Sequence, residues 1–271
     1  MTSTLFLQRD QPEGVPPLAL TGERTLPDVP EENYWYRRHL VVYEWIARRT
    51  AGLSVIDMAC GEGYGTEVLA RTAASAVGVD ANPEAHEHAR LRYPRPNLRY
   101  VRDLVDGFSE QADAVVFLQT IEHLQDPGAV LDHFRSLVGG SPAGADAARS
   151  KPGGGGVVFV STPNVLTLAP KGAPRSDNPW HVHEYRPEEF QKLCEEHFST
   201  VEMFGLYHAR KLRLHEIALN LGWDRLHKGL RLTKPFYGWF TPAIAASDFV
   251  LRPAQEADLR KALDFVAVCH A

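Results

Sequence analysis

The sequence has little of what secreted, membrane-spanning and zinc-binding proteins depend on. Its three cysteines, Cys60, Cys194 and Cys269, are too few and too widely spaced for a disulfide framework or a cysteine-based zinc site. No stretch approaches the roughly 18 consecutive apolar residues of a membrane span. The first residues also lack the basic region and apolar core of a signal peptide. We therefore expect a cytoplasmic protein with no membrane partner.

The chain also lacks an excess of positive charge. It has 29 Lys and Arg against 34 Asp and Glu, which gives a net charge of −5. A broad surface for nucleic acid needs the opposite balance, so we expect no nucleic-acid partner. The 271 residues are 44% apolar and 23% charged, as in a globular enzyme with one main domain and some additional pieces.

What the sequence does contain is an alternation of apolar runs and helical patterns. Tyr36, Leu40, Tyr43 and Ala47 recur at helical spacing and predict a helix that ends near Arg49. Beyond it, short apolar runs predict seven strands, most of them separated by helical patterns. These runs cover residues 54–59, 75–80, 98–103, 112–120, 156–164, 200–207 and 262–270. The pattern predicts an α/β protein with a Rossmann-like, doubly wound sheet of seven strands, which binds ligands at the carboxyl ends of its strands.

Three units follow from this organisation. Residues 1–50 form an N-terminal arm, loosely ordered up to residue 30, and a lid helix. Residues 51–205 form the cofactor-binding core, and residues 206–271 form a helical cap over the ligand edge together with the last strand. Within the core, residues 139–156 contain seven glycines and predict a flexible surface loop.

A glycine-rich turn follows the first predicted strand. Gly61, Gly63 and Gly65 of CGEGYG allow the backbone to turn tightly and to approach a ligand closely. Asp80 ends the second strand, where a carboxylate can bind both hydroxyls of an adenosine ribose. Enzymes that use NAD and enzymes that use S-adenosylmethionine (SAM) share this feature, so it does not separate them.

Other details of the turn favour SAM over NAD. The spacing is G-x-G-x-G, and Thr66 stands where a dinucleotide site has Gly or Ala. SAM has no phosphate but carries an ammonium and a sulfonium group, which suit Asp57 before the turn, and its adenine amine suits Asp103 after the third strand. We therefore expect SAM to be held by Asp57, Gly61, Gly63, Asp80 and Asp103. A NAD site, or a turn without any ligand, is the less favoured interpretation.

Four motifs now identify a family resemblance. In order, they are VIDMACGEGYG, VGVD, the aspartate of RYVRD, and DAVVFLQTIEHL. They resemble the motifs of class I SAM-dependent methyltransferases over residues 50–205, which implies that family's fold, cofactor and reaction. Ala59 departs from the pattern, since the family usually has glycine there. The segments TGERTLPDVPEENYWYRRH (21–39), STPN and NPWHVHEY resemble a bacterial branch that methylates sugars and polysaccharides.

Polar residues gather after the fourth and fifth predicted strands. Gln119, Glu122 and His123 follow the fourth strand, and His181 and His183 lie on the long loop after the fifth. Both segments pass over the same edge of the sheet in this fold, so we expect Glu122, His123 and His181 to position or activate an acceptor hydroxyl. The same three residues are candidate ligands for Mg²⁺ or Mn²⁺, which would lower the pKa of a bound hydroxyl.

The candidate metal ligands are similar to those of plant-type small-RNA 2′-O-methyltransferases. That resemblance implies a divalent metal held by two Glu and two His. Glu122, His123 and His181 match the set, whereas Gln119 stands where the first Glu would be and removes one negative charge. Two metal-free alternatives stay open. In one, His183 is the catalytic base; in the other, Glu122 and His123 only shape the SAM pocket. Gln119 is also expected to contact the cofactor.

Several other residues have both a functional and a structural interpretation. Arg38 would face the methionine carboxylate of SAM, or lie in water on a packed helix. Tyr207 and Lys211 match the Y-x-x-x-K of short-chain dehydrogenases, but Tyr207 closes a predicted strand. In the cap, Trp223 and Trp239 would stack on a sugar ring or pack in the interior. The basic runs at 210–213 and 225–231 would contact an anionic substrate or remain solvated.

These observations predict a SAM-dependent O-methyltransferase that acts on a hydroxyl of a sugar or oligosaccharide, with or without a divalent metal. The same chemistry would serve a quinone, a natural-product phenol or an RNA 2′-hydroxyl. More distant alternatives are a NAD-dependent dehydrogenase or epimerase, and a SAM-binding domain without catalytic activity.

Overall fold

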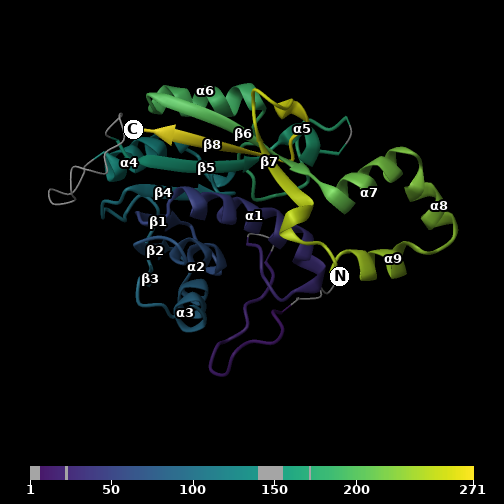
Figure 1. Ribbon diagram of the computed structural model, residues 1–271, viewed down its shortest axis with the longest axis horizontal. Coiled ribbons are helices and arrows are strands. Elements are labelled where there is room, and N and C mark those ends of the chain that lie inside the picture. Colours follow the sequence, from purple (N-terminus) through teal and green to yellow (C-terminus); the bar gives the residue numbers. More distant parts are fainter. Residues whose placement is uncertain (1–6, 22–23, 140–154, 171) are drawn as a thin grey trace.

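One mixed sheet organises the molecule (Figure 1). The computed structural model describes residues 7–21, 24–139, 155–170 and 172–271, so most of the predicted glycine-rich loop lies outside the described residues. Eight strands hydrogen-bond in the order β3-β2-β1-β4-β5-β8-β6-β7. They are β1 (Ser54–Met58), β2 (Ser75–Val79), β3 (Leu98–Val101), β4 (Ala114–Leu118), β5 (Val157–Pro163), β6 (Thr200–His208), β7 (Phe249–Pro253) and β8 (Asp264–His270).

The first five strands are parallel and the last three alternate in direction. β1 pairs with β2 and β4, β2 with β3, and β4 with β5, all in parallel register. β8 enters antiparallel between β5 and β6, and β7 lies antiparallel on the outer side of β6. The predicted α/β class is confirmed, but the sheet has eight strands within the described residues, where we expected seven. The additional strand, β7, lies within the segment that we expected to be a helical cap; it is short and ends in proline, as edge strands often do.

Helices cover both faces of the sheet. They are α1 (Asn33–Arg49), α2 (Tyr64–Ala70), α3 (Pro83–Arg92), α4 (Pro127–Val138), α5 (Val165–Leu168) and α6 (Pro187–His197). The alternating side chains of β4 join two separate clusters: Phe117 packs with Phe134 of α4 and Phe190 of α6, whereas Val116 packs with Ile46 of α1. All five residues of β4 are buried, and burial on both faces of the sheet explains why its sequence is one continuous apolar run.

Proline and side-chain caps set the helix starts. Proline opens α3, α4 and α6, where its missing N–H costs no helical hydrogen bond. The side chain of Asn82 accepts hydrogen bonds from two backbone amides at the start of α3, and Asp126 accepts one at the start of α4. Both helices therefore begin at the loops that follow the carboxyl ends of β2 and β4.

The N-terminal arm is more ordered than we expected. Leu18, Leu26 and Val29 form a small buried cluster. The arm is also tied to the core by Glu62 of the glycine turn, a side chain that is 1% exposed. Gln8 Nε2 donates to Glu62 Oε1 over 2.8 Å. These contacts hold the arm against the cofactor turn.

The helical segment between β6 and β7 projects away from the sheet (Figure 1). It consists of α7 (Arg210–Asn220), α8 (Trp223–Gly229) and α9 (Thr233–Phe240). At its base, Asn33 Nδ2 donates to the carbonyls of Thr241 and Ile244 over 2.9 Å each. Within the described residues, no helix has the length and apolar character needed to cross a membrane. Because β8 lies mid-sheet, residues 206–271 also contribute a central strand, and the proposed three-unit division stays a prediction.

Candidate functional site

A cavity of about 520 Å³ opens at the carboxyl ends of β1, β2 and β4. This is the edge where the doubly wound fold predicts ligand binding. The sheet side of the cavity includes Gly61, Asp80, Gln119 and His123. Its opposite wall comes from the N-terminal arm and α1, through Arg24, Thr25, His39 and Tyr43.

The glycine turn presents backbone to this cavity. Gly61 and Gly63 have φ of +57° and +96°, which an L side chain rarely adopts. A Cβ on Gly63 would lie 2.6 Å from Cβ of Ala89, so α3 packs against the turn only because this position is glycine. Ala59, which replaces the usual family glycine, also has a positive φ of 56°.

Asp80 links the turn to the end of β2. Its Oδ2 accepts a hydrogen bond from Gly61 N over 2.7 Å, and its Oδ1 accepts one from Asn82 N over 2.9 Å. The half-buried carboxylate lines the cavity. Its position beside the glycine backbone suits the ribose hydroxyls of an adenosine ligand.

Asp57 lies beneath the turn and does not line the cavity. Its buried carboxylate accepts hydrogen bonds from Thr66 Oγ1 over 2.7 Å and from Tyr43 OH over 3.3 Å. Burial raises the pKa of Asp57 to about 7, although these two hydrogen bonds oppose the shift. The structure thus places Tyr43 between this acid and the cavity, where we had predicted direct contact between Asp57 and the cofactor.

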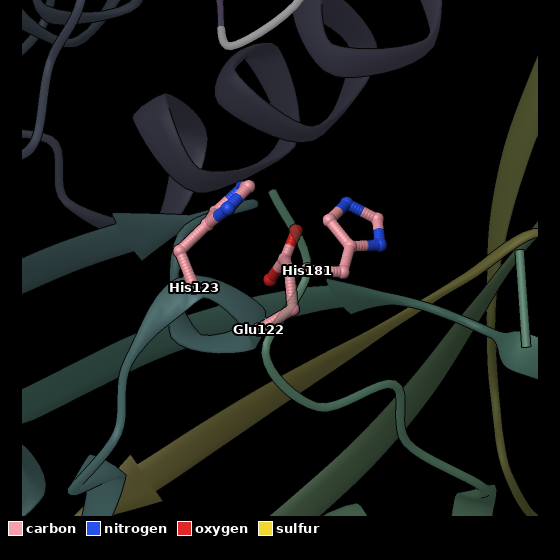
Figure 2. Close-up of side chains that lie close together, drawn as sticks. All are labelled: Glu122, His123 and His181. Carbon is pink, nitrogen blue, oxygen red and sulfur yellow. The ribbon is translucent and has the colours of Figure 1, made fainter. Parts of the chain in front are cut away.

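Glu122, His123 and His181 come together beyond the end of β4 (Figure 2). One candidate ligand atom from each lies within 4.8 Å of the other two. The short helix η2 (Ile121–His123) supplies Glu122 and His123, and the loop after β5 supplies His181. Backbone N–H groups of Val182 and His183 donate to the carbonyl of Glu122 over 2.8 and 3.1 Å, which fixes that loop beside η2.

Glu122 is a carboxyl group in an apolar setting. Its side chain is 1% exposed, and burial raises its pKa to about 8. A hydrogen bond from Thr162 Oγ1 to Glu122 Oε2, at 3.1 Å, partly opposes that shift. The group is therefore largely protonated at neutral pH, and a cation brought beside it would favour its ionised form.

Hydrogen bonds assign the ring nitrogens of the two histidines. His181 Nδ1 lies 2.7 Å from Glu184 Oε1, and His181 Nε2 lies 2.9 Å from Nδ2 of Asn178. Since a carboxylate only accepts and an amide NH₂ only donates, the neutral ring carries its proton on Nδ1 and its lone pair on Nε2. His123 Nδ1 lies 2.9 Å from the Trp180 carbonyl, which gives the same assignment. Both neutral rings thus carry their lone pair on Nε2, and in His181 that lone pair already accepts a hydrogen bond from Asn178.

His181 and Glu184 form a buried pair. Their side chains are 7% and 4% exposed. Burial opposes ionisation of Glu184, but hydrogen bonds from Ser176 and His181 outweigh it and lower the pKa of this carboxyl. An ionised carboxylate on Nδ1 orients the imidazole and stabilises its protonated form, as in catalytic dyads and around metal-bound histidines.

Comparison with known proteins agrees with this geometry. A family model described as a methyltransferase domain matches residues 34–202. A probable S-adenosylmethionine-dependent methyltransferase of Mycolicibacterium smegmatis is 36% identical, over 93% of this chain and 94% of its own. The chain belongs to the class I SAM-dependent methyltransferase family. It is an enzyme that uses SAM as its methyl donor, which sets aside the NAD-dependent and non-catalytic interpretations.

Two further similarities concern the reaction type and the fold. A ubiquinone biosynthesis O-methyltransferase of Albidiferax ferrireducens is 31% identical, over 64% of this methyltransferase and 69% of the relative. The crystal structure of a possible histamine N-methyltransferase from Thermotoga maritima superposes with a TM-score of 0.54 at 13% identity, over 89% of this chain and 94% of that one. The second similarity supports the fold alone.

Several predicted site residues do not line the cavity, and of the group Glu122, His123 and His181 only His123 does. Arg38 is the clearest correction, because its guanidinium is buried against Asp264 of β8 instead of facing a ligand. Asp103 is half-buried beyond β3, where its Oδ1 accepts from Leu104 N, and it does not line the cavity. His183 is exposed, with its ring centroid 4.5 Å from that of Tyr185.

Gln119 does line the cavity, with a positive φ of 53° at the end of β4. Its Nε2 donates to Ser161 Oγ over 3.1 Å, which holds the side chain against β5. Lys211 and Tyr207 do not form a dehydrogenase pair, since Lys211 Nζ lies 3.2 Å from Asp248 and Tyr207 stays within β6.

Sequence reasoning missed the cavity wall that comes from the arm and α1. Arg24 and Thr25 lie in the segment that carried the narrower family resemblance, yet no spacing marked them as cavity residues. Thr25 Oγ1 lies 2.9 Å from His39 Nδ1, which joins the arm to α1 at this wall. Trp180, 51% exposed, was also missed, although it directly precedes His181. Glu184 was given no role either, although it lies three residues after His181 in the segment NPWHVHEY.

Proposed function

We propose that this methyltransferase transfers the methyl group of SAM to a hydroxyl oxygen of a small acceptor, with His181 as the catalytic base. The observation that carries the proposal is the buried His181–Glu184 pair beside Glu122 and His123. An alcohol must lose a proton as its oxygen attacks the methyl carbon, whereas a neutral amine is already nucleophilic. A base oriented by an ionised carboxylate is therefore the feature expected of an O-methyltransferase.

The residues then have separate roles. Gly61, Gly63 and Asp80 hold the adenosine part of SAM, and Arg24 takes the role predicted for Arg38 toward the methionine carboxylate. Asp57 does not contact SAM directly. It accepts a hydrogen bond from Tyr43 and so holds this residue of the cavity wall in place. A contact between Asp103 and the adenine amine stays a prediction.

Proton transfer follows from the ring-nitrogen assignment. His181 Nε2 takes the acceptor proton as the new C–O bond forms and the C–S bond breaks, and the sulfur keeps the electron pair as S-adenosylhomocysteine leaves. Glu184 stabilises the imidazolium until the proton passes to solvent. Because Nε2 has a single lone pair, the acceptor hydroxyl must first replace Asn178 Nδ2 as the hydrogen-bond donor to it.

The same group of residues fits a divalent metal. Glu122 would become ionised beside a cation, and both histidines present Nε2, with Glu184 behind His181 as an outer partner. Two imidazoles and one carboxylate suit Mn²⁺ better than Mg²⁺, which prefers oxygen ligands. An ion held there would lower the pKa of a coordinated acceptor hydroxyl.

We propose a sugar or oligosaccharide as the acceptor. Trp180 offers an exposed aromatic surface at the cavity rim beside His123, and Gln119 and Thr120 supply polar groups nearby. A phenolic hydroxyl of a quinone precursor is the second candidate. The observation that favours it is the similarity to the ubiquinone biosynthesis O-methyltransferase, and the same base would serve it.

The test is methyl transfer from isotope-labelled SAM to a panel of sugars, oligosaccharides, dihydroxybenzenes and amines, each with Mn²⁺ and with EDTA. Label on hydroxyl oxygen supports the proposal, and the acceptor class that is labelled decides between its two forms. Label on amines alone would contradict it. Mn²⁺ binding followed by electron paramagnetic resonance, in wild type and Glu122→Gln, tests the metal site without relying on activity.

A further inference from the structure

The α7–α9 hairpin, residues 210–240, exposes many large apolar side chains. Seven of the fourteen exposed large apolar side chains of the described residues lie on it. Leu221 is 84% exposed, Trp239 71% and Leu214 69%. The others are Ile217, Leu226, Leu230 and Leu232. A concentration of large apolar side chains on a solvent-exposed surface marks an interaction site.

These side chains are not needed for the interior of the hairpin. On the inner side, the His215 ring packs against Phe240 and Phe236, with centroids 4.8 and 5.7 Å away. Leu214, Ile217 and Leu221 recur at i, i+3 and i+7, so they form a separate stripe along α7. The hairpin therefore has two apolar surfaces. One is its own aromatic interior, and the other is a stripe exposed to solvent.

Basic residues accompany the exposed apolar ones. Residues 210–240 contain seven Lys and Arg and two acidic residues, a net charge of +5 in a chain whose total is −5. Exposed members include Arg213, Arg225, Arg231 and Lys234. The hairpin is thus a cationic projection on an otherwise strongly acidic protein.

We propose that the α7–α9 hairpin attaches this methyltransferase to the surface of an anionic lipid bilayer. Exposed Leu and Trp beside Lys and Arg is the composition of segments that lie in the membrane interface, where apolar side chains enter the acyl boundary and basic ones bind anionic headgroups. A second copy of the chain is a poorer occupant, because two hairpins of charge +5 would repel each other across a symmetric contact. The attachment is peripheral, so it replaces our expectation of no membrane partner without requiring a spanning helix.

The hairpin also has a fixed relation to the active edge. β6 runs parallel to β5, since both are antiparallel to β8, and α7 begins just beyond the carboxyl end of β6. The hairpin therefore leaves the sheet at the edge that holds the cavity, but none of its residues lines that cavity. Substitutions in the hairpin should therefore leave SAM binding intact.

Vesicle flotation of the full chain tests the proposal, with phosphatidylcholine vesicles compared with mixed phosphatidylcholine–phosphatidylglycerol vesicles. We expect binding to the anionic vesicles alone, weakened by salt. The triple variant Arg213→Gln/Arg225→Gln/Arg231→Gln should bind on the order of 100-fold more weakly, at about fivefold per basic residue. Leu214→Ala/Leu221→Ala/Trp239→Ala should lose binding as well.

The matched controls are Leu91→Ala/Leu104→Ala, two exposed leucines outside the hairpin, and Arg102→Gln, an exposed arginine outside it. Both should bind like wild type, and all variants should bind S-adenosylhomocysteine equally. Absence of vesicle binding, or equal loss in controls and hairpin variants, would overturn the proposal. So would a dimer in sedimentation that the leucine and tryptophan substitutions dissociate, since the second copy would then be the occupant.

Discussion

Arg38 of α1 and Asp264 of β8 form a buried ion pair between residues far apart in the sequence. Arg38 Nη2 lies 2.5 Å from Asp264 Oδ1, and Nε lies 2.6 Å from Oδ2, with side chains 5% and 1% exposed. Arg38 Nη2 also donates to the carbonyl of Leu263 over 2.8 Å. Burial disfavours the guanidinium charge, but Asp264 outweighs it and raises the pKa of Arg38. The pair fastens the lid helix to a central strand.

Breaking this pair should destabilise the protein. We expect Arg38→Met to lower the free energy of unfolding by about 3–5 kcal/mol, because Asp264 would remain buried without its partner. Urea unfolding followed by circular dichroism measures the loss. Arg90→Met, which removes an exposed pair with Glu87, should change stability by less than about 1 kcal/mol. Equal effects of the two substitutions would show that the buried pair contributes little.

Ala59→Gly should stabilise the protein. Ala59 has φ of 56°, a left-handed conformation that costs an L residue roughly 1–2 kcal/mol and glycine much less. After the entropy cost of glycine, we expect a gain of about 0.5–1 kcal/mol in urea unfolding. Ala218→Gly within α7 is the control and should lose about 1 kcal/mol. A loss at position 59 as well would mean that the turn prefers alanine for its packing.

Asp80→Ala should weaken cofactor binding. The substitution removes an acceptor for the ribose hydroxyls and also the hydrogen bond from Gly61 N. Charge-assisted hydrogen bonds of this kind are worth about 1.5–3 kcal/mol, so the Kd for S-adenosylhomocysteine should rise on the order of 10–100-fold in calorimetry. An unchanged Kd would contradict the role assigned to Asp80. Asp103→Ala tests the predicted contact with the adenine amine separately, and a higher Kd there would support that contact.

His181→Ala should reduce turnover and spare cofactor binding. Loss of a general base lowers kcat by about 10²–10⁴-fold, while the Kd for S-adenosylhomocysteine should stay within about twofold. His183→Ala, two residues away on the exposed surface, should keep nearly full activity. Loss of activity in His183→Ala alone would favour His183 as the base, which was the metal-free alternative in our sequence analysis.

Asp57 should make the protein less stable as the pH rises. Its folded-state pKa of about 7 lies above the ordinary value of 3.8, so the folded state binds the extra proton between these values. Stability from this group is complete below pH 3.8 and falls up to about pH 7, by roughly 2 kcal/mol or less between pH 5 and 7. Asp57→Asn should flatten that part of the stability–pH curve in urea unfolding. An unchanged slope would place the titration on other groups.

The order of the elements and the position of the cofactor turn could be predicted from the sequence alone. Apolar runs such as AVVFL predict buried parallel strands because both faces of the sheet are covered, and this burial erases the polar alternation of an exposed strand. The positions of Gly61 and Gly63 were equally readable, since only glycine adopts their positive φ without strain. The proximity of Glu122, His123 and His181 also followed from strand ends that meet at one edge.

The partners of the charged groups, by contrast, became evident only in the folded protein. Arg38 and Arg24 are indistinguishable in sequence, yet Asp264, 226 residues after Arg38, binds the first and leaves the second on the cavity wall. Likewise, nothing local separates His181 from His183 until Glu184 and Asn178 surround one ring while the other lies in solvent. This difference arises because a local pattern fixes backbone conformation and the buried face. The charge and protonation of a side chain depend instead on partners that folding brings from distant segments.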